Sequence, residues 1–193
     1  MIAPLRVGFV TGATPDKWAR SWRAGRRESL HLVQTTEAEQ VDGVQDGSLD
    51  MAIVRLPVDQ NGLHCVRLYD ELQVAVASRE HLLAAADDEV MTADLDDEQL
   101  VRPHASGWAP SAEQLAWPPM SEQEAIETVA AGTGVVVVPM SVARLHQRKD
   151  VVSRVVSDLG PTTIALVWRI DRDDEVTQAF VGVTKGRTPR TSR

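Results

Sequence analysis

The sequence of 193 residues contains one cysteine and no long apolar run, and each of these two features excludes certain classes of protein. Its single cysteine, Cys65, cannot form a disulfide within the chain, which is typical of proteins in a reducing cytoplasm. We interpret Cys65 as a small core residue, with a reactive thiol as the alternative. No apolar run approaches the about eighteen residues of a membrane span, and residues 1–6 lack the pattern of a signal peptide. We therefore expect a cytoplasmic protein that does not enter a membrane.

Positive charge is also in short supply. The 20 Lys and Arg residues stand against 28 Asp and Glu residues, which gives a formal net charge of -8 at pH 7. Such a chain lacks the broad basic face that binding to phosphate backbones requires, so we expect no direct DNA binding. The arginine-bearing residues 187–193 are expected to form a basic, disordered tail. The remaining composition, 43% hydrophobic and 25% charged, is typical of one large folded domain or two small lobes.

Catalytic and metal-binding motifs are missing from the sequence. There is no Gly-x-Ser-x-Gly elbow and no His-Glu-x-x-His, and the 5 histidines are scattered without ligand spacing. A single cysteine excludes a zinc site made of paired thiolates. The stretch 132–134, Gly-Thr-Gly, lacks the third glycine of a dinucleotide fingerprint and is interpreted as a tight link between elements. We expect neither enzymatic activity, nor a metal, nor a cofactor.

The central feature of the sequence is the short apolar run Met51–Val54, which predicts an interior strand. Arg55 follows directly, at the carboxyl end of that strand, and Leu56-Pro57 then turns the chain away. In open α/β sheets, ligands bind at the carboxyl ends of parallel strands. The pattern therefore makes Arg55 a candidate ligand contact.

Two strand–helix pairs precede this run, with strands expected at residues 5–10 and 30–35. Thr14 is expected to cap the first helix, with Pro15 at its first helical position. The capping box Thr36–Glu39 predicts a second helix, which would continue up to the glycine before the central run. The order β-α-β-α-β is typical of a parallel sheet covered by helices.

The pattern is less regular after residue 62. Residues 63–78 predict two more strands, and residues 79–99 predict a short helical patch followed by acidic, solvated chain. Residues 103–119 predict a long loop, and the capping box Ser121–Glu124 opens a helix that ends near Gly132. The remaining elements are expected as strands at 135–138, 151–156 and 163–168 and as helices at 141–147 and 173–186.

Four stretches together resemble a known family. They are residues 5–8 (Leu-Arg-Val-Gly), 47–53 (Gly-Ser-Leu-Asp-Met-Ala-Ile), 78–84 (Ser-Arg-Glu-His-Leu-Leu-Ala) and 130–135 (Ala-Ala-Gly-Thr-Gly-Val), the last running on to Pro139. In this order and spacing they are similar to the effector-binding domain of LysR-type transcriptional regulators. The likeness extends from Leu5 to about Lys185, nearly the whole chain.

The chain departs from the family pattern in two places. No winged helix-turn-helix and no linker helix precede residue 5, so we expect a stand-alone effector domain, with an excised piece as the alternative. In the first helix, residues 14–18 read Thr-Pro-Asp-Lys-Trp where the family usually has Leu-Pro-x-Leu. We therefore expect this wall of the ligand pocket to be particular to this chain.

The resemblance implies the type 2 periplasmic-binding-protein fold, with two Rossmann-like α/β lobes joined by two crossover segments and an effector cleft between them. We expect lobe one at residues 1–78 plus 160–186 and lobe two at residues 79–159. The family also implies dimers, so we expect a homodimer or a mixed dimer with a full-length regulator.

A cleft walled by strand ends and helix starts offers unpaired backbone N–H groups, which suit a carboxylate or another anion. The candidate ligand-binding residues are Thr11, Gly12, Thr14, Thr35, Thr36 and Arg55 in lobe one and Ser106, Gly107, Trp108, Thr133, Val138 and Pro139 in lobe two. Alternatives stay open for several of them. Arg55 could pair with a surface acid, Thr14 and Thr36 could be plain helix caps, and Trp108 could anchor a loop.

The function that these features favour is sensing of a small-molecule effector in transcriptional regulation. Ligand binding would close the two lobes, and a partner would respond to the changed lobe angle. One alternative is a solute-binding protein of the transport type, which shares the fold but needs export. The other is an enzyme on the same fold, for which the sequence offers no nucleophile or metal set.

Overall fold

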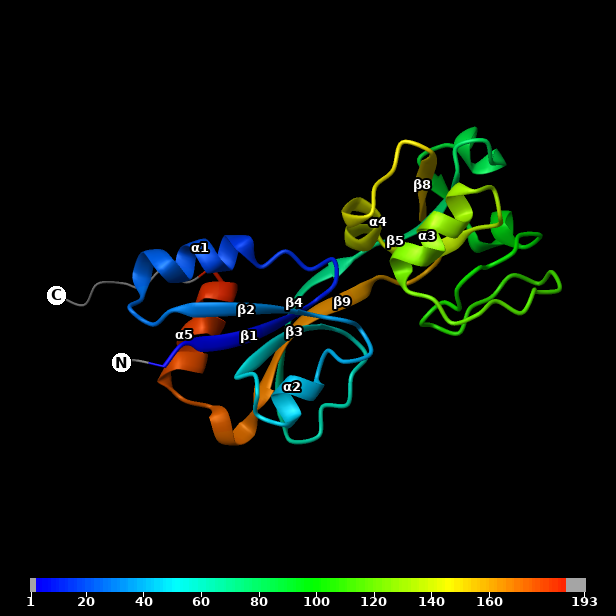
Figure 1. Ribbon diagram of the computed structural model, residues 1–193. Coiled ribbons are helices and arrows are strands. Elements are labelled where there is room, and N and C mark those ends of the chain that lie inside the picture. The colour runs from blue at the N-terminus through cyan, green and yellow to red at the C-terminus, as the bar shows by residue number, and fades with distance from the viewer. Residues whose placement is uncertain (1–2, 187–193) are drawn as a thin grey trace. The chain divides into compact units, whose positions relative to one another are not determined.

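The computed structural model describes residues 3–186 and has a mixed α/β fold with two β-sheets, in agreement with the α/β class expected from the sequence (Figure 1). The chain divides into two compact units. Unit 1 comprises Met1–Asp70 and Thr163–Arg193, and unit 2 comprises Glu71–Thr162. The strand Gln73–Ser78 therefore lies in unit 2, whereas the expected border at 78 assigns it to lobe one. The expected basic tail, residues 187–193, lies outside the described residues.

Unit 1 is built on a five-stranded sheet. Its strands are β1 (Leu5–Val10), β2 (Leu30–Thr35), β3 (Met51–Arg55), β4 (Leu63–Glu71) and β9 (Thr162–Arg169), and its helices are α1 (Asp16–Gly25), α2 (Asp42–Gln45), η3 (Ile170–Arg172) and α5 (Glu175–Thr184). The strand order is β2-β1-β3-β9-β4. β1 is parallel to both β2 and β3, as the β-α-β-α-β pattern predicts, and β9 is antiparallel to β3.

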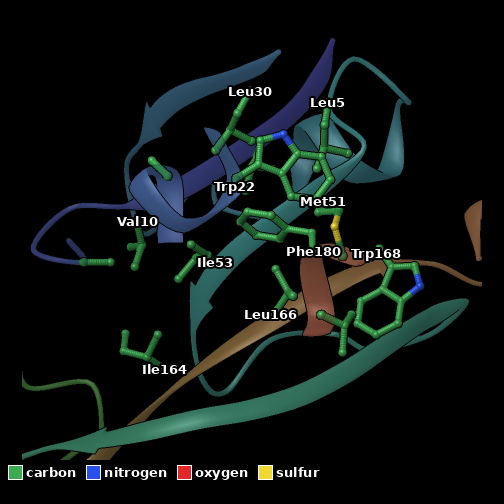
Figure 2. Close-up of a cluster of buried hydrophobic side chains, with 14 residues drawn as sticks. Leu5, Val10, Trp22, Leu30, Met51, Ile53, Ile164, Leu166, Trp168 and Phe180 are labelled. Carbon is green, nitrogen blue, oxygen red and sulfur yellow. The ribbon is translucent and has the colours of Figure 1, made fainter. Parts of the chain in front are cut away.

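One face of this sheet carries large side chains, because successive residues of a strand point to opposite faces. Met51 and Ile53 of β3 belong to a buried cluster with Trp22 of α1 and Phe180 of α5. The two rings meet edge to face with their centroids 5.6 Å apart, and Figure 2 shows them next to each other. Burying each of these side chains stabilises the fold by about 1.5–3 kcal/mol, so α1 and α5 are held mainly by this cluster.

The opposite face of the sheet carries smaller side chains. Ala52 and Val54 of β3 pack with Val44 of α2 and with Leu49. Gly8 of β1 leaves the space that Leu49 fills, since a Cβ at position 8 would lie 2.8 Å from Leu49 Cδ1. Glycine at this position therefore lets the segment before β3 pack closely on β1.

A buried carboxylate ties the start of β3 to β1 and to η3. Asp50, which is 6% exposed, accepts from the backbone N–H of Arg6 at 2.9 Å and from its guanidinium at 3.2 and 3.1 Å. Arg172 donates to the same carboxylate at 2.9 Å. Burial by itself raises the pKa of Asp50, but the hydrogen bonds from Arg6 and Arg172 outweigh it, so the pKa lies below its usual value. The ionised carboxylate thus links segments from both ends of the chain.

Unit 2 is built on a four-stranded sheet. Its strands are β5 (Gln73–Ser78), β6 (Glu89–Val90), β7 (Val136–Pro139) and β8 (Val151–Val156), and its helices are η1 (Leu82–Ala84), η2 (Thr92–Leu95), α3 (Glu122–Ala130) and α4 (Met140–Leu145). The order is β6-β8-β5-β7, with β5 antiparallel to both of its neighbours and β6 parallel to β8. Each residue of β5 is buried, so this strand is the centre of the unit.

Both faces of the unit 2 sheet are covered. Val74 and Val76 of β5 pack on one face with Ile126 of α3 and Val142 of α4. On the other face, Ala75 and Ala77 pack with apolar residues of the segment 87–99, namely Val90 and Leu95. The expectation that this acidic segment is solvated is therefore wrong for its apolar residues, which anchor it to the sheet.

The first two helices begin later than the sequence predicts. Thr14 does not cap α1: the N-cap is Pro15, which already has helical angles and whose carbonyl accepts the first helical bond, from Ala19 at 2.9 Å. Thr36 does not open a helix either, because its hydroxyl donates to the Glu39 carboxylate within a turn, and α2 starts only at Asp42. The capping box at Ser121 is confirmed, with its hydroxyl accepting from the Glu124 N–H.

The segment 36–41 stays non-helical because it is held from outside. The side chain of Gln40 accepts from the backbone N–H of Arg55 at 2.7 Å and donates to the Arg55 carbonyl at 3.0 Å. These two bonds satisfy both backbone groups at the end of β3. A helix through this segment would withdraw Gln40 from them, so the turn is favoured over the capping box.

Candidate functional site

The carboxyl ends of β1, β2 and β3 meet at one edge of the unit 1 sheet, because the three strands are parallel. Val10 pairs with Thr35, and Phe9 pairs with Ile53. Five of the candidate site residues end or follow these strands, and we call this set the unit 1 edge: Thr11, Gly12, Thr35, Thr36 and Arg55. Thr14 lies two residues further along the same loop and is exposed.

Arg55 is buried beneath the unit 1 edge, with 2% of its side chain exposed. One guanidinium nitrogen lies 3.3 Å from the Glu37 carboxylate, and the other donates to the Thr11 carbonyl at 3.2 Å. The ion pair with an acid, left open by the sequence, is therefore present. The positive charge also holds the loop after β1 in place through its carbonyl.

The hydroxyl of Thr35 is a buried polar atom that lacks a hydrogen-bond partner among the described residues. The backbone carbonyl of Thr35, by contrast, accepts hydrogen bonds from the Thr11 N–H at 3.1 Å and from the Thr11 hydroxyl at 3.3 Å. The backbone N–H groups of Gly12 and Thr36 make no hydrogen bond within residues 3–186. The unit 1 edge thus combines one buried hydroxyl and two backbone donors that an acceptor group could satisfy.

In unit 2, side chains from distant positions form a polar cluster, which we call the Gln73 cluster: Gln73, His104, Ser106 and Thr162. Gln73 starts β5 and is 1% exposed; its amide donates to the Thr162 hydroxyl at 3.2 Å. His104 Nε2 lies 3.4 Å from the amide oxygen of Gln73, and His104 Nδ1 lies 2.7 Å from the Ser106 hydroxyl. The candidate Ser106 therefore belongs to a network that reaches the first residue of β5.

The contacts of His104 determine its protonation. Because the Gln73 oxygen accepts, Nε2 of His104 carries the proton and Nδ1 accepts from the Ser106 hydroxyl and N–H. Burial, with a smaller effect from the charge of Arg102, lowers the pKa of His104. The imidazole is therefore neutral at pH 7, in the tautomer that the network requires.

The structure separates the other unit 2 candidates. Trp108 is half-buried against the core of unit 2 and meets the His104 ring edge-on at 6.4 Å, so it both anchors the loop and touches the cluster. Gly107, between Ser106 and Trp108, has a positive φ of 79°. Pro139 pairs with Gln73 across the sheet.

The remaining unit 2 candidates, Val138 within β7 and Thr133 before it, are not part of the Gln73 cluster. Val138 pairs with Val74 in the sheet and is buried. Thr133 precedes β7, at the end of that strand opposite to Pro139. The structure therefore places Thr133 away from the Gln73 cluster.

Sequence reasoning missed the residues that organise both places. Gln73 opens the apolar run 74–77, and a lone amide at the start of a buried strand is a signal that could have found it. Gln40 stands between the acids Glu39 and Asp42 and gives no such signal. His104 was grouped with the scattered histidines, because its partner lies 31 residues away. Glu37 had no signal, since it stands among other exposed polar residues.

Two further features are absent from the described residues. Residues 3–186 contain no group of three or more His, Cys, Asp or Glu side chains placed to hold a metal ion. Among the helices of that same range, none is long and apolar enough to span a bilayer.

Comparison with protein families gives a clear result. Residues 19–188 match the family model described as the LysR substrate binding domain. The match covers most of the chain, so the chain belongs to the LysR substrate binding domain family, and the resemblance noted in the sequence is confirmed. Its fold is the type 2 periplasmic-binding-protein fold of these domains. No curated protein sequence matches the chain.

Solved structures agree with this fold. The effector binding domain of a BenM variant has a TM-score of 0.77 at 19% identity, over 97% of this chain and 94% of that chain. The reduced OxyR regulatory domain from Pseudomonas aeruginosa has a TM-score of 0.73 at 19% identity, over 96% and 97%. A cysteine variant of OxyR from Corynebacterium glutamicum has a TM-score of 0.72 at 22% identity, over 95% of this chain but only 64% of that chain.

Proposed function

We propose that this chain senses a small anionic effector and that its response serves transcriptional regulation in the cytoplasm. Membership of the LysR substrate binding domain family supports the sensing role. The observation that carries the anionic part is the unpartnered, buried hydroxyl of Thr35, with the free N–H groups of Gly12 and Thr36 on the same sheet edge. All three are donors, so a carboxylate would satisfy them.

The chemistry of the unit 1 edge fits an anion better than a neutral ligand. A buried hydroxyl without a partner costs about 1–3 kcal/mol, and a carboxylate that accepts from it would remove this cost. Arg55, whose charge is paired with Glu37, would act indirectly by keeping the Thr11 loop in position. Hydrogen bonds to a charged group are worth about 1.5–3 kcal/mol each, so two or three of them contribute about 3–9 kcal/mol; micromolar affinity, at about 8 kcal/mol, needs contacts beyond these in most of that range.

Unit 2 would add its own ligand contacts through Ser106, Gly107 and Trp108, next to the neutral His104. The Ser106 hydroxyl donates to His104 Nδ1, which is the contact that a serine makes with a general base. The same hydroxyl accepts from the Trp108 N–H at 3.2 Å and so also links residues of its own loop. Membership of the LysR substrate binding domain family favours sensing over catalysis. We therefore propose a sensor without enzymatic activity.

We further propose that the chain forms a homodimer, or a mixed dimer with a full-length regulator, through a surface other than the unit 1 edge. β2 is the edge strand of the unit 1 sheet, and Val33 on it is 44% exposed. An exposed edge strand with an apolar side chain favours pairing with another chain. Sedimentation at tens of micromolar should show a dimer; a single 21 kDa species would contradict this.

Mass spectrometry of small molecules released from the purified protein should identify the effector, and calorimetry should then measure its affinity. We expect a carboxylate or another anion. Thr35→Val, which removes the unpartnered hydroxyl at constant shape, should weaken binding by about ten-fold. Thr184→Val in α5 is the matched control and should bind as the parent does. A neutral effector, or equal affinity in Thr35→Val, would contradict the proposal.

A further inference from the structure

Unit 2 contains a second place suited to a ligand, away from the Gln73 cluster. A pocket of about 350 Å³ opens on the face of the sheet that α3 and α4 cover. Val74 and Val76 of β5 and Val155 of β8 form its floor, and Met140 and Ala143 of α4 form one wall. Ligand pockets in proteins measure about 300–1,000 Å³, so this one suits a small molecule.

The pocket exists because α4 is short. This helix has 6 residues and packs on the sheet through Val142, which is fully buried. It ends at Leu145, before it can cover the whole of β8, where Val151 stays partly exposed. The apolar side chains that stay partly exposed in the pocket are therefore Met140 and Ala143 of α4 and Val151 and Val155 of β8, whereas Val74 and Val76 at the bottom are almost fully buried.

The rim of the pocket is positively charged, although the chain as a whole has a net charge of -8. Arg79, Arg144 and Arg148 line it. Arg148 is neutralised by Asp150, with two contacts of 2.8 Å. The side chains of Arg79 and Arg144 make no hydrogen bond or ion pair within 4 Å among the described residues, although the charge of Arg79 helps Arg148 to lower the pKa of Asp150. Asp88 is the acid that lines the same pocket.

We propose that this pocket binds a small organic acid with one anionic head and an apolar body. The carboxylate would lie between the guanidinium groups of Arg79 and Arg144, which can each donate two hydrogen bonds to it. The hydrocarbon part would cover the partly exposed side chains of Met140, Ala143, Val151 and Val155. Asp88 repels additional negative charge, so a monoanion is favoured over a dianion. This site is distinct from the unit 1 edge and does not depend on the function proposed for it.

Matched probes with the same apolar body can test both halves of the proposal. Octanoate, octanol and octylammonium should be titrated into the full chain labelled with ¹³C at the methionine methyl groups. Met140 lines the pocket and should shift with octanoate, whereas Met51, buried in unit 1, should not. Octanoate should bind more tightly than the other two probes. Hexanoate should bind roughly ten-fold more weakly than octanoate, because it has two fewer methylene groups to bury.

Three variants locate the contacts. Arg144→Gln should weaken octanoate binding by about five-fold, because an exposed charge contributes modestly. The double variant Arg79→Gln/Arg144→Gln should weaken it by about twenty-fold. Ala143→Met, which fills the pocket from α4 with a good helix former, should abolish the Met140 shift. Arg20→Gln on α1 is the control and should leave binding unchanged. An unchanged amide spectrum in each variant confirms that the fold is retained.

Three results would overturn the proposal. The first is equal binding of octanol and octanoate, which would leave no role for the arginines. The second is unchanged octanoate affinity in the doubly substituted variant. The third is a Met140 shift that follows protein concentration rather than octanoate, with sedimentation showing that the probe only changes the oligomeric state. That outcome would assign the pocket to contacts between copies of this chain.

Discussion

The two units use different kinds of groups at their polar places. At the unit 1 edge, most free donors belong to the backbone and are positioned by three parallel strands, whose carboxyl ends coincide by topology. In unit 2, the Gln73 cluster consists of side chains that the long loop 103–119 brings to β5. Backbone donors neither titrate nor change rotamer, whereas a histidine network does both. The comparison therefore predicts a rigid, pH-insensitive edge in unit 1 and an adjustable, titrating cluster in unit 2.

The largest expected effect tests whether the units are independent. Phe180→Ala in α5 and Ile126→Ala in α3 each empty a fully buried position, in unit 1 and unit 2 respectively. Each should lower the free energy of unfolding by about 3–4 kcal/mol. Hydrogen exchange should rise only in the unit that carries the change, because the apolar clusters are separate. Equal acceleration in both units would show that they unfold as one.

The next effect concerns the ionised carboxylate of unit 1. Asp50→Asn keeps the shape but removes the charge that binds Arg6 and Arg172, and should cost about 2 kcal/mol at pH 7. The folded protein binds a proton at Asp50 more weakly than the unfolded chain, whose Asp titrates near pH 3.9. The contribution is therefore present above this value and is lost as the pH falls below it.

Urea unfolding of the parent and the Asp50→Asn variant at pH 7, 5 and 3 should show this. The difference between them should stay constant down to pH 5 and shrink at pH 3. Asp171→Asn, at an exposed acid next to Arg169, is the control and should change little at any of the three values. A constant difference at pH 3 would mean that the Asp50 carboxylate is not what holds the two arginines.

We expect acid to destabilise unit 2 at a higher pH than the one at which it destabilises unit 1. The pKa of His104 is lowered by its burial and, less strongly, by Arg102, so the unfolded chain binds this proton more readily. The contribution of neutral His104 to stability is therefore fully present above about pH 6.5, the ordinary pKa of a histidine in an unfolded chain. It is lost progressively as the pH falls below that value. The loss should be roughly 1 kcal/mol or less, because solvent screens this partly exposed group. Protection from exchange in residues 103–119, measured relative to the intrinsic exchange rate at each pH, should fall between pH 7 and 5.5. It should not fall in His104→Gln, whereas His146→Gln should behave as the parent.

The smallest expected effect on stability belongs to Thr35, whose hydroxyl carries the proposal of an anionic effector. Thr35→Val removes a buried hydroxyl that has no partner, so the unfolding free energy should rise by up to about 1 kcal/mol in the absence of ligand. Thermal unfolding of the effector-free protein measures it. A marked loss of stability would show that the Thr35 hydroxyl is already satisfied and would weaken the case for an anion there.

Local sequence patterns predicted most of the fold, because most elements depend on near neighbours. The strands of unit 1, the helix after Ser121 and the parallel order around β1 all follow from apolar periodicity and capping residues. The Thr36 capping box failed for a non-local reason: Gln40 binds the backbone of Arg55, 15 residues further on. A pattern of four residues contains no information about such a contact.

The candidate sites were predictable only where topology alone positions them. Thr11, Thr35 and Arg55 come together because parallel strands end at one edge, and the strand pattern was sufficient for that. The Gln73–His104 contact depends on the path of an irregular loop, which has no periodicity to interpret. Thr133 and Pro139 lie at opposite ends of the same short strand, so the sequence pattern that groups them contains no information about which of the two lies near Gln73.

The position of β9 has a consequence for how the chain is made. β9 lies between β3 and β4 in the unit 1 sheet, although it is the last strand to be synthesised. Unit 2, by contrast, is one continuous segment, Glu71–Thr162. On the ribosome, unit 2 can fold as soon as its own residues have emerged. At that stage β3 and β4 each have an unpaired edge, because β9 has not yet been translated. The unit that is started first is therefore finished last, and a nascent-chain chaperone would find its exposed strand edges in unit 1.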